Sequence, residues 1–135
     1  MKKLLLCACC LVLVTGCSKV NVQNPNAPDG TATTTAPAVV TDKIEFRVFG
    51  SGLLLPANIR FIDPLNGLTI VTASPPYFAA VSNTDSSVFL FCEAQATAFS
   101  TGSLQVQIFV NGKLFREAAQ FGSNLDVIAS GTFRR

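Results

Sequence analysis

The sequence contains no histidine and no tryptophan among its 135 residues. Without histidine, neither a Ser–His nor a Cys–His nucleophilic pair can form. A zinc site also needs nitrogen or sulfur ligands beyond carboxylates, and the sequence offers too few of them. The glycines of Gly50-Ser51-Gly52 lack the basic partner and the helix of a phosphate-binding loop. These absences favour a protein that is not an enzyme, and we expect no metal or other cofactor.

Cysteine is almost absent from the region that could form a folded domain. Three of the five cysteines lie in an apolar N-terminal run and Cys17 follows it, which leaves Cys92 alone. One thiol cannot form an intramolecular disulfide. Cys92 stands in the apolar strand pattern of residues 89–94, where it is either packed in a core or reactive. Free cysteine is among the most buried residue types, so the pattern favours packing.

Charge is sparse and nearly balanced, with 10 Lys and Arg against 8 Asp and Glu. The excess comes from Lys2 and Lys3 at the N-terminus. No run of basic residues follows them, so we expect no nucleic-acid partner. The carboxylates are scattered along the chain, and nothing in their spacing favours the paired acids of a glycosidase.

The N-terminus has the pattern of an export signal. A basic start, an apolar run over residues 4–14 and small residues after it are typical of a secretory signal peptide. The ending Val14-Thr15-Gly16-Cys17 looks like the lipobox of bacterial lipoproteins, in which the cysteine thiol takes up a diacylglycerol. The apolar run is shorter than the ~20 residues of a membrane-spanning helix. An ordinary signal peptide and a short anchor helix are the alternatives.

This pattern predicts a lipid-anchored protein of the bacterial cell envelope. Residues 1–16 are the expected lipoprotein signal peptide, and Cys17 is the expected lipidation site, carrying acyl chains such as palmitate. Each buried CH₂ of such chains contributes about 0.8 kcal/mol, so a diacylated thiol anchors stably. Ser18 in place of Asp resembles the sorting pattern of outer-membrane lipoproteins, facing the periplasm or the cell surface. Residues 17–42 are poor in large apolar side chains and predict a disordered linker to a domain over residues 43–135.

The domain region alternates apolar and polar side chains, with turn residues at short intervals, which is the β-strand pattern. Strands are expected over residues 44–48, 59–61, 69–72, 77–81, 88–99, 104–110, 113–120 and 125–133. Asn111-Gly112 separates two of them, where a type I′ turn needs positive φ at both central residues. All eleven phenylalanines lie in this region and can supply a core. The pattern predicts an all-β fold, a small antiparallel Ig-like β-sandwich of about seven strands.

The alternation also places aromatic side chains on the outer surface. If Leu90 and Cys92 face the core, then Phe89 and Phe91 face outward, and Phe109 lies on the outward side of its own strand. If these strands are neighbours, the three phenylalanines share one sheet face. Exposed apolar patches of this kind often mark contacts with a partner or a membrane. The alternatives are a different register, or a linker or loop that covers the face.

Several segments resemble the mycobacterial membrane protein small (MmpS) family. They are residues 46–52 (FRVFGSG), 59–63 (IRFID), 90–95 (LFCEAQ), 102–113 (GSLQVQIFVNGK) and 129–131 (ASG). In that family the soluble part is a small β-sandwich held at the envelope, and its members assist RND-type transporters, including in siderophore export. The chain departs from the family in its lipid anchor, and in Ser74-Pro75-Pro76-Tyr77 where the family has a Pro-Trp region.

These observations together predict a non-catalytic, lipid-anchored envelope protein. Its β-sandwich would bind a membrane or periplasmic partner, such as the transporter that the MmpS resemblance implies. Phe89, Phe91 and Phe109 are the residues expected to make the contact. The alternative is a surface module that binds a small ligand or a glycan on an aromatic platform.

Overall fold

The computed structural model describes residues 38–135, which form antiparallel β-strands joined by short turns. The six strands are β1 (Asp42–Leu53), β2 (Ala57–Asp63), β3 (Gly67–Ala73), β4 (Tyr77–Asn83), β5 (Ser87–Val110) and β6 (Lys113–Arg134). The predicted all-β antiparallel class is confirmed. Across these residues, no helix is long and apolar enough to cross a membrane. The expected signal peptide, Cys17 and nearly all of the expected linker lie outside the described residues.

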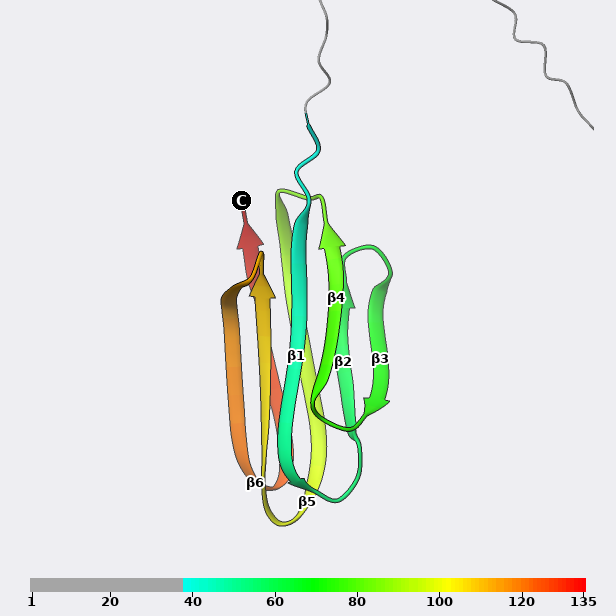
Figure 1. The fold of residues 1–135 in the computed structure, drawn as a ribbon, viewed down its shortest axis with the longest axis vertical. Helices are drawn as coiled ribbons and strands as arrows, with labels where there is room; N and C mark the ends of the chain where they lie inside the picture. Colours follow the sequence, from blue (N-terminus) through cyan, green and yellow to red (C-terminus); the bar gives the residue numbers. More distant parts are fainter. Residues whose placement is uncertain (1–37) are drawn as a thin grey trace, which may run out of the picture. The chain divides into compact units, whose positions relative to one another are not determined.

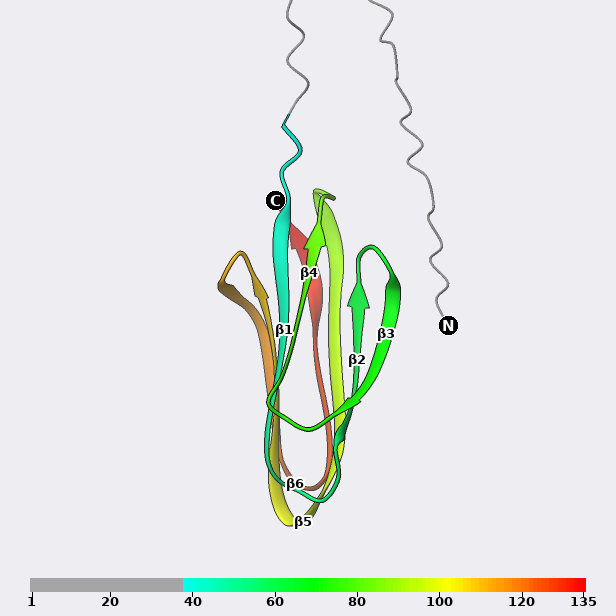
Figure 2. The same cartoon turned by 45° about the vertical axis from the view of Figure 1, so that its right-hand side comes forward.

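The strands belong to one antiparallel sheet that folds over into two layers (Figures 1 and 2). The hydrogen-bonded order is β3-β2-β5-β1-β4, with β6 paired to β5. Both β5 and β6 are long enough to contribute to each layer. Residues 87–97 of β5 pair with β2 and with residues 124–134 of β6, whereas residues 102–110 pair with β1 and with residues 113–122. We call the layer with β2 and β3 layer A, and the layer with β1 and β4 layer B.

The count of six strands differs from the expected seven or so, because two predicted breaks are bends inside continuous strands. The expected strands at 88–99 and 104–110 are one strand, β5, and those at 113–120 and 125–133 are β6. At the bend of β5, a Cβ on Gly102 would lie 2.6 Å from the Cβ of Ala98 and 2.8 Å from the carbonyl oxygen of Ser51. Only glycine permits so close an approach. β6 bends beside it, where Gly122 has a φ of 145°.

The hydrophobic core lies between the two layers. Inward side chains of β1 and β5 are fully buried, and the rings of Phe46 in layer B and Phe61 in layer A meet with centroids 4.9 Å apart. Cys92 has 0% exposure within this core, and burial, with a smaller effect of Glu93, raises its pKa to about 12. The expectation that Cys92 is packed is therefore confirmed.

A network of polar side chains closes the end of the sandwich at which β1 begins, here called the Asp42 end. The buried carboxylate of Asp42 accepts hydrogen bonds from Asn111 Nδ2 at 2.9 Å and Arg135 Nε at 2.8 Å. Asn111 also accepts a hydrogen bond from the Lys43 amide at 2.9 Å. Asn111 and Gly112 have φ values of 50° and 76°, which confirms the predicted turn between β5 and β6. The bends of β5 and β6 lie at the opposite end, the Gly102 end (Figure 1).

Candidate functional site

The structure does not bring the three predicted contact residues together. Phe89 and Phe91 lie on the first half of β5, in layer A, and Phe109 lies on the second half, in layer B. Because β5 folds back on itself between them, the outward sides of its two halves point in opposite directions. Phe89 is 50% exposed, and Phe91 and Phe109 are partly buried. The hypothesis of one face with three phenylalanines is wrong, since it assumed that the two segments were neighbours in a single layer.

Phe109 is covered by charged side chains on the outer face of layer B. The guanidinium carbon of Arg47 lies 4.0 Å from the centroid of the Phe109 ring, a cation–π contact. Glu45 holds Arg47 in place through a bond of 2.6 Å and also pairs with Lys43 at 2.5 Å. Further along, Gln107 donates a hydrogen bond to Glu117. The surroundings of Phe109 are therefore an ordered ionic network rather than an open apolar patch.

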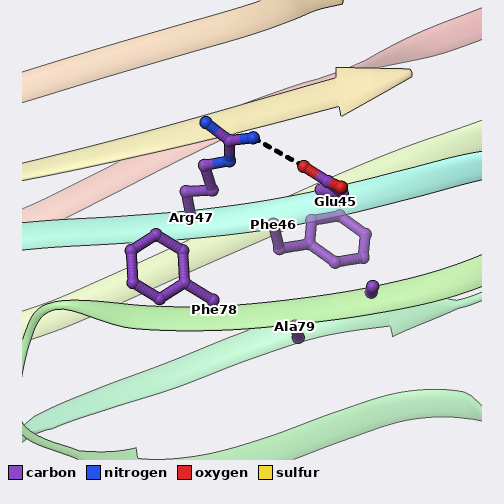
Figure 3. Close-up of a pocket in the computed structure, with 6 residues that line it drawn as sticks. Glu45, Phe46, Arg47, Phe78 and Ala79 are labelled. Carbon is purple, nitrogen blue, oxygen red and sulfur yellow. Dashed lines mark hydrogen bonds and ion pairs between the residues drawn. The ribbon is translucent and has the colours of Figure 1, made fainter. Parts of the chain in front are cut away.

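A shallow pocket of about 330 Å³ lies between β1 and β4 on this side. Figure 3 shows Arg47 directed toward Glu45, with Phe78 beside them on β4. Hydrogen bonds from Lys43 and then Arg47 lower the pKa of Glu45, so its carboxylate is ionised at neutral pH. A general acid needs a raised pKa. The pocket offers an ion pair and an aromatic ring, which suits binding of a small polar ligand better than proton transfer.

The outer face of layer A is different in character, and we call it the Phe89 face. Its apolar members are Ile62, Leu68, Ile70, Phe89, Phe91 and Ile128, which come from four neighbouring strand segments. Four of them are large side chains that are about half exposed: Leu68 at 53%, Ile70 at 59%, Phe89 at 50% and Ile128 at 51%. Outward positions of a sheet that faces only water are usually polar. An apolar face of this kind is typical of a docking surface.

An ion pair between Arg60 and Glu93 lies at the centre of the Phe89 face. Arg60 on β2 lies opposite Glu93 on β5, with 3.1 Å between Arg60 Nη1 and Glu93 Oε2. Gln95 Nε2 donates a hydrogen bond to Glu93 Oε1 at 2.8 Å, and the Glu93 side chain is only 8% exposed. Arg60 Nε is buried and has no hydrogen-bond partner among the described residues. The ion pair neutralises the Glu93 carboxylate, and the outward positions around it hold both the apolar side chains named above and polar ones such as Gln95 and Ser130.

Sequence reasoning missed most of the Phe89 face. The signal that could have found it is alternation, because an outward Arg60 implies an outward Ile62, and a β2–β3 hairpin then places Leu68 and Ile70 on the same side. Sequence reasoning also missed the exposed apolar side chains at the Gly102 end, which are Leu54, Leu55, Phe99 and Phe121. Phe99 is 83% exposed because it lies in the bend of β5.

Comparison with protein-family models gives no match, and comparison with curated proteins gives none. The resemblance to the MmpS family therefore stays a prediction that rests on short motifs in β1, β2, β5 and β6.

Proposed function

We propose that the protein is a non-catalytic, lipid-anchored envelope protein whose β-sandwich binds a membrane or periplasmic partner through the Phe89 face. The observation that carries the proposal is the cluster of half-exposed apolar side chains in layer A around the Arg60–Glu93 pair. Exposing large apolar side chains to water costs free energy that a docked partner would recover. The MmpS resemblance suggests a transporter as one such partner.

The behaviour of the carboxylates supports a role other than catalysis. Asp42, Glu45 and Asp63 all have lowered pKa values, because each accepts hydrogen bonds from neighbouring side chains or backbone amides. A carboxylate that acts as a general acid near neutral pH needs the opposite shift. Asp42 and Asp63 instead stabilise a strand end and a turn, and Glu45 holds Lys43 and Arg47 on the outer face of layer B.

Only the N-terminal sequence supports the proposed lipid anchor, and Cys17 lies outside the described residues. The 24 residues between Cys17 and Asp42 can reach ~80 Å when fully extended, at about 3.3–3.6 Å per residue. The 12-residue strand β1 is about 40 Å long at 3.3 Å per residue. A tether of this length allows the domain to present the Phe89 face to a partner in the same membrane.

Co-purification from native membranes tests this proposal, with the full chain as bait. The double variant Phe89→Ala/Phe91→Ala removes two apolar contacts from the Phe89 face, and Phe109→Ala is the matched control on the opposite layer. We expect one envelope protein to be retained by the wild type and by Phe109→Ala, and lost from the double variant. Circular dichroism of each purified variant shows whether the sandwich is intact. Retention of the same protein by a folded double variant would refute the proposed surface.

The second candidate is a module that binds a small ligand or a glycan, and the pocket beside Arg47 and Phe78 favours it. The expected signature is a rise in melting temperature on addition of the ligand, with no partner protein present. Arg47→Ala and Phe78→Ala should both abolish that rise, whereas Phe89→Ala should keep it. If no ligand in a library raises the melting temperature of the wild type, this candidate function is refuted.

A further inference from the structure

Among the described residues, one pair of sheet edges carries charged side chains, which disfavour the addition of a strand, and the other pair carries none. On one side, both edges are formed by β6, which has five charged residues: Lys113, Arg116, Glu117, Asp126 and Arg134. On the other side, the edges are β3 and β4, and neither strand contains a charged residue. Natural edge strands are usually blunted by charge, proline or bulges, because their free N–H and C=O groups attract other strands. The contrast within this molecule indicates that the β3–β4 side accepts a further strand.

β3 is the better of the two unprotected edges. It pairs with β2 over all seven residues without a bulge, and its other side has no strand partner among the described residues. Its sequence has four consecutive β-branched residues, 69–72, a composition that suits strand pairing. The outward side chains Leu68 and Ile70 belong to the Phe89 face, so an added strand would extend that face. The centre of β4, by contrast, is Ala79-Ala80, which offers little cross-strand contact.

We propose that two copies of this chain pair through β3, antiparallel and about a two-fold axis at Ile70. Two identical edge strands related by a two-fold axis can exchange hydrogen bonds only when they run antiparallel, which gives an isologous interface. Full overlap of Gly67–Ala73 with itself places Ile70 opposite Ile70 of the partner subunit. Leu68 then lies opposite Thr72 of the partner subunit. Every outward pair is apolar or β-branched and no charge is opposed, so the strand is complementary to itself.

This pairing joins the two A layers into one continuous sheet and merges two Phe89 faces into a single surface. The antiparallel arrangement also directs the two Asp42 ends in opposite directions. If both chains are anchored at Cys17, as proposed above, the ~80 Å reach of the intervening residues exceeds the ~40 Å length of β1, so both anchors can enter one membrane.

Cysteine crosslinking of the full chain in native membranes tests the interface. Ile70→Cys places two thiols next to each other across the two-fold axis, and a short bis-maleimide should convert most of that variant into a species of twice the chain mass. Ile128→Cys is the matched control, because Ile128 is 51% exposed on the same face but lies on the charged strand β6. The parent chain sets the background, and its Cys92 is buried in the core, so we expect it to contribute no crosslink. Equal crosslinking of both variants, or an Ile70→Cys variant that forms no dimer, would each overturn the proposal.

Charge complementation provides a second test that does not depend on crosslinking. Ile70→Lys and Ile70→Glu each oppose two like charges across the axis, so each should weaken self-association of the solubilised full chain at least tenfold in sedimentation experiments. An equimolar mixture of the two variants should recover the dimer, which also shows that both variants fold. A wild-type chain that sediments as a monomer, or a mixture that does not recover the dimer, would contradict pairing about Ile70. The Phe89→Ala/Phe91→Ala variant should still dimerise, so loss of the partner and loss of the dimer are separable.

Discussion

Gly102 is the position at which one added methyl group should disturb the fold most. Its Cβ would lie 2.6 Å from the Cβ of Ala98 and 2.8 Å from the carbonyl oxygen of Ser51. Both distances are well below a normal van der Waals contact, and the oxygen belongs to the backbone of β1, which cannot swing aside as a side chain can. Gly102→Ala must therefore push β5 and β1 apart at the bend. Overpacking of this kind costs typically about 1–3 kcal/mol.

Urea denaturation followed by far-UV circular dichroism measures the loss of stability in the full chain. Each kcal/mol corresponds to a fall in melting temperature of about 4–8 °C for a domain of 60–100 residues. Ala98→Gly removes the nearer of the two contacts, so Ala98→Gly/Gly102→Ala should be more stable than the sum of the single effects predicts. Strictly additive effects, or a Gly102→Ala variant as stable as the wild type, would refute the inference that β5 folds back tightly at this point.

Three further predictions concern buried polar and thiol groups. Arg60→Ala leaves Glu93 without its cation and should lower the free energy of unfolding by about 1–3 kcal/mol, and adding Glu93→Gln should recover part of that loss. Hydrogen bonds from Asn111 and then Arg135 lower the pKa of the Asp42 carboxyl. The stabilising effect of the carboxylate is therefore complete above its ordinary pKa of 3.8 and is lost as the pH falls through the pKa of the folded state. Asp42→Asn should flatten the acid limb of the pH–stability curve. With its pKa raised to about 12, Cys92 should resist a thiol reagent at pH 8 in the native protein and react at once in denaturant.

Alternation of side chains was enough to predict the fold class and the approximate position of every strand. Period-2 patterns depend only on neighbours along the chain, so Ile44, Phe46 and Val48 could be assigned to the core directly. The turn at Asn111-Gly112 was equally local, because it follows from the φ preferences of those two residues.

The bends and the assignment of faces could not be predicted in the same way. A polar stretch such as residues 100–103 looks the same whether it is a loop between strands or a bend within one. Only the close approach of Gly102 to β1, a contact between residues far apart in the sequence, decides between them. Alternation predicts that Phe89 and Phe109 point outward, but it does not predict that they belong to different layers. The Arg60–Glu93 pair depends on the β2–β5 register, which the sequence does not specify.

Site-specific photocrosslinking in living cells tests the central claim, partner binding through the Phe89 face, most directly. A photoreactive amino acid replaces either Phe89 or Phe109 in the full chain, one position in each layer. The account predicts a discrete adduct with one envelope protein from position 89 and none from position 109. An adduct of equal yield from both positions, or from position 109 alone, would contradict it.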